Sequence, residues 1–211
     1  DNAAVAQKVV EAYLDQRQAR DTQIVVATNA MRGLVSVQLR EHLKSSGELA
    51  AREHDVARLY EKKLTRAEHL DARSYALGDK VVDHKGFQGV GTPRNMVETI
   101  IGIDQVNNLL KVRGEKGGER LIDLNVEADR KSPSFASFTE RSHPIAAGEK
   151  MVWEARFGDR GYERGGAFTV LAFDSRSVTI RHEGEGKLAG KTETLSSRDE
   201  ALRFSGYGYA M

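Results

Sequence analysis

Three groups of residues in this sequence could bind a negatively charged partner, and the first is Thr28-Asn29 with Arg32. A hydroxyl, an amide and the backbone N–H groups at the start of a helix bind anions well, and Arg32 follows one helical turn later. A phosphate of a nucleic acid fits this set. Thr and Asn are also good helix N-caps. The residues alone favour capping, and one geometry can serve both roles.

The second group lies in the segment WEARFGDRGYERGG, residues 153–166, where three arginines are interspersed with three aromatic residues: Arg156, Arg160 and Arg164 with Trp153, Phe157 and Tyr162. Arginines hold phosphates and aromatic rings stack on bases, so this mixture suits single-stranded DNA. Three acidic residues in the same segment nearly cancel the charge, and a solvated hairpin explains it equally well. The third group, Arg66 and Arg73 in LTRAEHLDARSY, is better explained as a solvated helix face.

Motifs for autonomous catalysis are missing from the sequence. There is no G-x-x-x-x-G-K-[ST] loop and no acidic cluster placed to hold Mg²⁺ after a strand. The glycine-rich RGYERGGAF precedes a strand and therefore predicts a hairpin turn. The histidines have no metal-ligand spacing and are interpreted as surface or half-buried: His42, His54, His69, His84, His143 and His182. We predict no catalytic residue, metal site or cofactor in this chain.

Composition bounds the class of protein. The 211 residues are 39% hydrophobic and 7% aromatic, which favours several small units over one large core. A net charge of +1 means that any nucleic-acid contact must come from a local patch. The chain has no cysteine, no signal peptide and no apolar run of membrane-spanning length, so we expect a reducing compartment and no membrane insertion. It begins inside a helical pattern and ends abruptly at SGYGYAM, which indicates a fragment of a larger protein.

Hydrophobic periodicity places these residues on an α-β-α piece and a β-rich remainder. Helices are predicted over residues 2–20, capped by Asn2, and over about 31–45, ended by Gly47, with a buried strand at 23–27 between them. This piece, residues 1–49, needs the remainder of a parallel sheet. Residues 50–78 are predicted to be a helical connector, in which Thr65 and Glu68 form a capping box.

The β-rich remainder looks like two copies of one design. A G-[DE]-K-x-V motif marks the start of each copy, residues 79–146 and 147–199, and begins at Gly78 and at Gly148. TIIGIDQVNNLLKV in the first copy matches TVLAFDSRSVTI in the second. Each copy reads as a meander that a small antiparallel barrel closes economically. The polar stretch 128–144 is predicted to be a loop or edge connector, and 200–211 a return segment toward the α-β-α piece. The predicted fold class is therefore α+β.

The order of these pieces resembles RecD-type superfamily 1 helicases and the helicase part of conjugative relaxases. DTQIVVATNAMRGLVSVQLREHLKSSGEL resembles their strand, "TN" and helix ending near G-x-L. LTRAEHLDARSYALGDKVV closely matches the relaxase pattern LTRAxxxxAxSYxxGDxV, and GEKMVWEARFGDRGYERGGAFTVLAFDSRSVTI matches a later barrel segment. In that segment Ala155-Arg156 stands where the family has Thr-Arg, and Glu163-Arg164-Gly165 replaces its "xNG".

The resemblance implies a slice of the second RecA-like domain with two Src-homology-3-type barrel insertions. It implies that Thr28-Asn29 contacts a nucleic-acid backbone, whereas ATP and Mg²⁺ are held elsewhere in the parent protein. Implied partners are single-stranded DNA, the type IV secretion coupling protein and the rest of the parent, in the cytoplasm of a bacterial donor cell from which the parent is delivered to a recipient. The residues expected on DNA are Thr28, Asn29, Arg32, Trp153, Arg156, Arg160, Tyr162 and Arg164.

Two functions remain open at this point. In the first, the fragment is a non-catalytic module that serves as an internal translocation signal for type IV secretion and contributes to single-stranded DNA binding. In the second, it is the strand-gripping and strand-separating subdomain of an active ATP-dependent 5′–3′ helicase. The family contains both an active and a degenerate helicase copy, and either origin fits the sequence.

Overall fold

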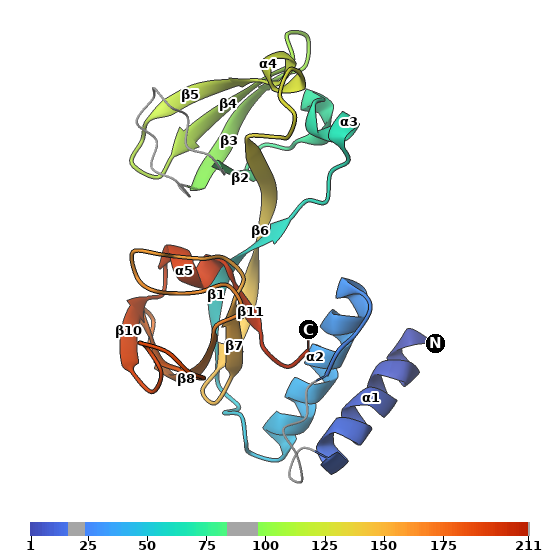
Figure 1. The fold of residues 1–211 in the computed structure, drawn as a ribbon, viewed down its shortest axis with the longest axis vertical. Coiled ribbons are helices and arrows are strands. Elements are labelled where there is room, and N and C mark those ends of the chain that lie inside the picture. The colour runs from blue at the N-terminus through green and yellow to red at the C-terminus, as the bar shows by residue number, and fades with distance from the viewer. Residues whose placement is uncertain (17–23, 84–96, 211) are drawn as a thin grey trace. The chain divides into compact units, whose positions relative to one another are not determined.

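The fold is α+β, as the sequence predicts (Figure 1). A computed structural model describes residues 1–16, 24–83 and 97–210. These residues form two compact units: unit 1 comprises residues 1–58 and 142–211, and unit 2 comprises residues 59–141. The long strands β1 (Glu53–Glu61) and β6 (Phe135–Ala146) have residues in both units.

Unit 1 begins with two helices that lie side by side (Figure 1), α1 (Asn2–Gln16) and α2 (Asn29–Ser45). The cap of α1 differs from the prediction, because the side chain of Asp1, not Asn2, accepts a hydrogen bond from the Ala3 N–H at 3.0 Å. Gly47 ends the α2 turn with a φ of +78°, as predicted, since glycine adopts this left-handed conformation without a Cβ clash. The remainder of the first predicted helix, 17–20, lies outside the described residues.

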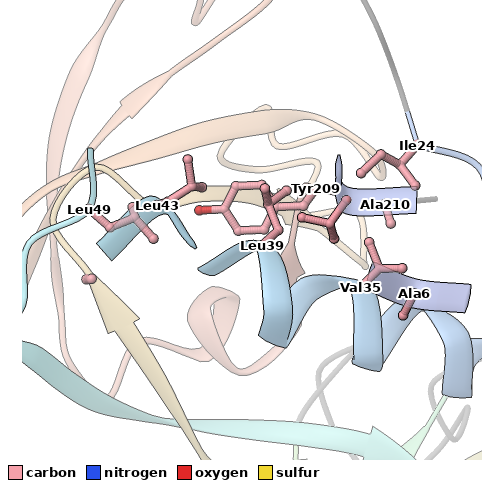
Figure 2. Close-up of a cluster of buried hydrophobic side chains, with 10 residues drawn as sticks. Ala6, Ile24, Val35, Leu39, Leu43, Leu49, Tyr209 and Ala210 are labelled. Carbon is pink, nitrogen blue, oxygen red and sulfur yellow. The ribbon is translucent and has the colours of Figure 1, made fainter. Parts of the chain in front are cut away.

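The predicted strand at residues 23–27 is largely absent. Gln23 lies outside the described residues, Ile24 forms a single parallel bridge with Ala210, and the residues after Ile24 are not in a strand. A buried strand needs a ladder of partners, and this segment has one bridge in the described part of the chain. Figure 2 shows the hydrophobic cluster around it, in which the Tyr209 ring lies beside Leu39 of α2.

The connector predicted at 50–78 is not wholly helical. Its first half is the nine-residue strand β1. Its second half contains α3 (Arg66–His69) and the 3₁₀ helix η1 (Ala72–Ser74). The capping box is confirmed: Thr65 accepts from the Glu68 N–H, and the Glu68 carboxylate accepts from the Thr65 N–H at 2.7 Å.

The predicted meander of unit 2 is present as an antiparallel ladder. Its order is β6-β2-β3-β4-β5, within a six-stranded sheet that ends at β1. The strands are β2 (Lys80–Asp83), β3 (Val97–Asp104), β4 (Leu109–Gly114) and β5 (Glu119–Asp123), and α4 (Leu124–Ala128) follows β5. The core side of this ladder carries Val81, Ile100, Val112 and Ile122, all buried.

Unit 1 contains the second ladder, whose order β11-β7-β8-β9-β10 repeats the first. Its strands are β7 (Lys150–Trp153), β8 (Ala167–Phe173), β9 (Ser177–His182), β10 (Thr192–Ser196) and β11 (Ser205–Tyr207), with α5 (Glu200–Arg203) between the last two. Residues 200–211, predicted to be a return segment, thus include the strand that pairs with β7.

The internal repeat is confirmed at the level of register. The β3–β4 ladder is interrupted by a bulge between Ile100 and Gly102, and the β8–β9 ladder by a bulge between Val170 and Ala172. These positions correspond along the two matched sequence segments. A bulge re-aims the strand and increases its twist, so both copies bend at the same point.

One prediction in this region is wrong. Residues 128–144 were expected to be a loop or edge connector, yet most of them belong to the twelve-residue strand β6. Thr139 to Ser142 are polar because the middle of β6 is exposed, while its two ends are buried. The strand pairs with β2 from Phe135 to Phe138, and its buried ends carry hydrophobic side chains: Phe135, Ala136, Ile145 and Ala146. Closed barrels stay a prediction, since the strand orders do not join the ends of either sheet.

Candidate nucleic-acid interface

The N-terminus of α2 brings the first predicted group together. Thr28 is the N-cap, and its Oγ1 accepts a hydrogen bond from the Met31 N–H at 3.1 Å. The Arg32 guanidinium donates to the Asn29 side-chain oxygen, which orients the positive charge beside the first turn. Because the first N–H groups of a helix have no intrahelical acceptor and carry partial positive charge, this corner favours an anion.

The arginines of the 153–166 segment face away from the protein core but do not form one patch. Arg156 pairs with Glu163 at 3.0 Å, and both side chains are largely exposed. Arg160 pairs with Asp199 at 2.7 Å, and hydrogen bonding to that carboxylate raises its pKa. Arg164 is exposed. An exposed pair such as Arg156–Glu163 is weak and exchanges readily with a competing anion such as a phosphate, whereas the Asp199 side chain that binds Arg160 is only 13% exposed.

The aromatic residues of the same segment lie in the core. Trp153 and Tyr162 are 2% and 1% exposed, and their rings stack with centroids 4.6 Å apart. The Tyr162 hydroxyl donates to Glu193 at 2.6 Å. Burial, and after it the Glu193 carboxylate, raise the pKa of Tyr162. Neither ring presents a face to a nucleic-acid base in this conformation, so stacking by these two residues has no support in the geometry.

The interpretation of the histidines needs correction. His69, His143 and His182 are buried, rather than lying at the surface or half-buried. Burial, followed by the charges of Arg58 and Arg40, lowers the pKa of His143 to about 3. Sequence reasoning misses this because an isolated polar residue carries no signal of its tertiary environment. His84 lies outside the described residues, within which no group of three side chains is placed to hold a metal ion.

Sequence reasoning also misses a buried ion pair that anchors α2 to the second ladder. Arg40 donates from Nε and Nη2 to the Glu149 carboxylate at 2.9–3.1 Å, and Glu149 is fully buried. The Tyr209 hydroxyl donates to the same carboxylate at 2.7 Å, and Arg40 also pairs with Glu53 at 2.8 Å. Burial lowers the pKa of Arg40, but its interactions with Glu149, Tyr207 and Glu53 together outweigh burial and raise the pKa.

The available sequence signal for this pair is the repeated G-[DE]-K turn. Glu149 is the acidic residue of the second copy, and Asp79 is that of the first. In each copy the carboxylate accepts the N–H of the residue three positions earlier, from Ala76 at 2.9 Å and from Ala146 at 3.2 Å. The Lys62 Nζ also pairs with the Asp79 carboxylate at 2.6 Å. The acid therefore fixes the turn and binds one cation from outside it.

A cavity of about 290 Å³ lies where α1 and α2 meet the second ladder. Lys150 and Glu48 give it one positive and one negative side chain, and the remaining lining is mainly apolar: Tyr13, Leu43, Leu49, Gly148 and Tyr209. None of the residues predicted to bind DNA lines it. The geometry therefore offers a polyanion the cationic α2 corner and, as a separate single charge, the exposed Arg164.

Comparison with known proteins does not assign the chain to a family. No family model matches it, and no curated protein is significantly similar to it. No helix within residues 1–16, 24–83 and 97–210 is both long and apolar enough to cross a membrane. The function must therefore be argued from the fold and the surfaces described above.

Proposed function

We propose that this chain is a non-catalytic module of a conjugative relaxase-helicase, which contributes to single-stranded DNA binding and acts as an internal translocation signal for type IV secretion. The observation that carries the proposal is the pair of ladders with the same strand order and the same bulge. They follow a helix capped by Thr28 and a short helix capped by Thr65. This is the order of elements that the sequence resemblance implies.

The two ladders are best explained as small Src-homology-3-type barrels. Each has five antiparallel strands, and a one-turn helix precedes the strand that pairs back to the first: α4 before β6, and α5 before β11. Such a subdomain buries one face of its sheet and exposes the other. Two exposed faces on one chain supply a folded recognition surface, which a translocation signal requires.

The DNA contribution is assigned to phosphate contacts. The Thr28–Arg32 corner and the exposed Arg164 are cationic, whereas the aromatic rings near Arg164 are buried. Binding through phosphates is independent of base sequence and weakens steeply with salt. We expect weak affinity for an oligo(dT) probe, lost at high salt and reduced by Arg32→Ala. Affinity that resists salt would contradict phosphate-dominated binding.

Delivery tests the secretion signal directly. The chain is fused to a site-specific recombinase, and recombination is scored in recipient cells mated with donors that carry a conjugative system. Recombinants should appear with the fusion and disappear in donors that lack the coupling protein. Recombinase without the chain controls for leakage. A soluble, abundant fusion that is never delivered would refute the secretion role and leave DNA binding untouched.

The strand-gripping part of an active helicase is the second candidate. The parallel bridge between Ile24 and Ala210 favours it, because parallel pairing is typical of α/β motor domains. The shared hydrophobic cluster of α1, α2 and Tyr209 joins the same segments. This function requires single-strand affinity in the micromolar range or tighter at low salt. Weaker binding together with successful delivery would favour the translocation module.

A further inference from the structure

The outward face of the second ladder carries a row of cationic and hydroxyl side chains. Register places Lys150 opposite Thr169, Thr169 opposite Arg181, and Arg181 opposite Thr192. The strand neighbours of Lys150, Thr169 and Arg181 are buried, namely Met151, Phe168, Ile180 and His182. Leu195, three positions after Thr192, is also buried, and side chains alternate between the two faces of a strand. The four residues therefore form a row across β7, β8, β9 and β10 that faces away from the core.

The same row recurs in the first ladder with one change. Lys80 lies opposite Thr99, Thr99 opposite Arg113, and Arg113 opposite Glu119. The Lys–Thr–Arg order is thus repeated, but a carboxylate occupies the fourth position instead of Thr192. This arrangement arises only from register, because the four positions lie on four different segments of each copy.

In the first ladder the row is neutralised by its own acids. Glu119 pairs with Arg113 at 2.6 Å and with Lys111 at 2.7 Å, and these two cations lower its pKa. Lys80 donates to Thr99 at 3.0 Å and lies 3.7 Å from Glu140, with its side chain only 16% exposed. The first row presents little uncompensated positive charge.

The second row is more open. Arg181 donates to Glu183 at 3.0 Å, and Thr169 donates to the same carboxylate at 2.8 Å, so one acid partly compensates the charge of this row. A guanidinium has five N–H donors, and Arg181 bonds Glu183 through Nε and Nη2. The Arg181 and Arg113 side chains are similarly exposed, at 47% and 53%, so the two rows differ at the lysine. Lys150 is exposed, whereas the Lys80 side chain is only 16% exposed.

We propose that the row of Lys150, Thr169, Arg181 and Thr192 binds the phosphate backbone of single-stranded nucleic acid, and that Glu119 abolishes this capacity in the first copy. The inference rests on the proposed DNA contribution and adds a sheet face to the Thr28–Arg32 corner and Arg164 as a site of phosphate contact. Neighbouring strands are about 4.8 Å apart, so the Cα atoms of Lys150 and Arg181 are about 10 Å apart. Long side chains at that separation can hold a phosphate between them, with the threonine hydroxyls as further donors.

The test is the affinity of the whole chain for a fluorescent oligo(dT) probe over a range of salt concentrations. Arg181→Ala should weaken binding about tenfold, the loss expected for one charge-assisted hydrogen bond. The slope of log affinity against log salt should fall by about 0.7, the value for one phosphate on a single strand. Arg113→Ala is the matched control, because it removes the same charge from the same register position and should leave affinity unchanged.

Exchange of the fourth residue makes the test reciprocal. Thr192→Glu copies the first ladder and should weaken binding as much as Arg181→Ala, whereas Thr192→Ser should not. Equal effects of Arg181→Ala and Arg113→Ala, or binding that survives Thr192→Glu, would overturn the row while leaving the DNA contribution in place. Absence of any binding by the unaltered chain at low salt would overturn both. Thermal melts establish that each variant is folded.

Discussion

Glu149→Gln tests whether the buried ion pair holds α2 on the second ladder. The substitution keeps the size of the side chain and removes its charge, which leaves Arg40 facing a neutral amide. The Arg40 and Glu149 side chains are 10% and 0% exposed, and breaking a buried pair by neutralising one partner costs about 3–5 kcal/mol. Glu53 still compensates part of the Arg40 charge, so we expect a loss of about 3 kcal/mol in the free energy of unfolding.

Fluorescence of the single tryptophan measures this loss without labelling. Trp153 is buried in the second ladder, in the same unit as Glu149, so urea unfolding followed by its emission reports on the relevant core. For a chain of this size, about 3 kcal/mol corresponds to roughly 6–12 °C in melting temperature.

Glu53→Gln is the control for this substitution. It removes a carboxylate that also pairs with Arg40 but is 34% exposed, and should cost under about 1 kcal/mol. If the two variants lose the same stability, the Glu149 carboxylate is not an anchor and the reasoning fails.

Three further predictions concern unit 1, and the Gly78 turn of unit 2 serves as a control for one of them. His143 has a pKa of about 3 in the folded protein, against 6.5 in the unfolded chain. Between these two values the unfolded chain binds one more proton than the folded protein. The free energy of unfolding should therefore fall by up to about 1.4 kcal/mol per pH unit as the pH drops from 6.5 toward 3. His143→Gln should flatten that slope, and an unchanged slope would contradict the assignment. Gly148→Ala places a Cβ 2.7 Å from the Glu48 carbonyl oxygen at a φ of +92°, whereas Gly78→Ala at +89° meets no atom within 4 Å. Gly148→Ala should therefore cost clearly more than the roughly 1–2 kcal/mol of the left-handed conformation alone, measured by urea unfolding, and equal costs would refute the close approach. Thr28→Ala should lose about 1 kcal/mol through the missing cap, whereas Thr28→Ser should retain it in the same assay.

Features that depend on neighbouring residues could be predicted from the sequence. The Thr65–Glu68 capping box and the end of α2 at Gly47 follow from residues within a few positions of one another. The repeated G-[DE]-K turn was visible for the same reason. Interactions between residues close in sequence specify these elements, independently of their tertiary contacts.

Features that depend on distant partners could not be predicted. Arg40 and Glu149 are 109 residues apart, and neither side chain indicates its partner. The middle of β6 is polar and exposed between two buried ends, so the polar stretch in the sequence was interpreted as a loop. Trp153 and Tyr162 alternate with arginines as DNA-stacking residues do, yet they fill the core of the second ladder. Composition alone did not distinguish a base platform from a core.

Comparison of the two copies gives a physical criterion for where function lies. Both retain the ladder order, the bulge and the acid that fixes the first turn. They differ in the cation that pairs with this acid: Asp79 forms an ion pair with Lys62, whereas Glu149 forms one with Arg40 of α2. They differ again on the outward row, where Glu119 stands in one copy and Thr192 in the other. Positions that set the backbone must agree for both copies to fold alike, whereas outward positions are free to differ. A difference in charge at such a position is therefore where one copy can acquire a partner that the other lacks.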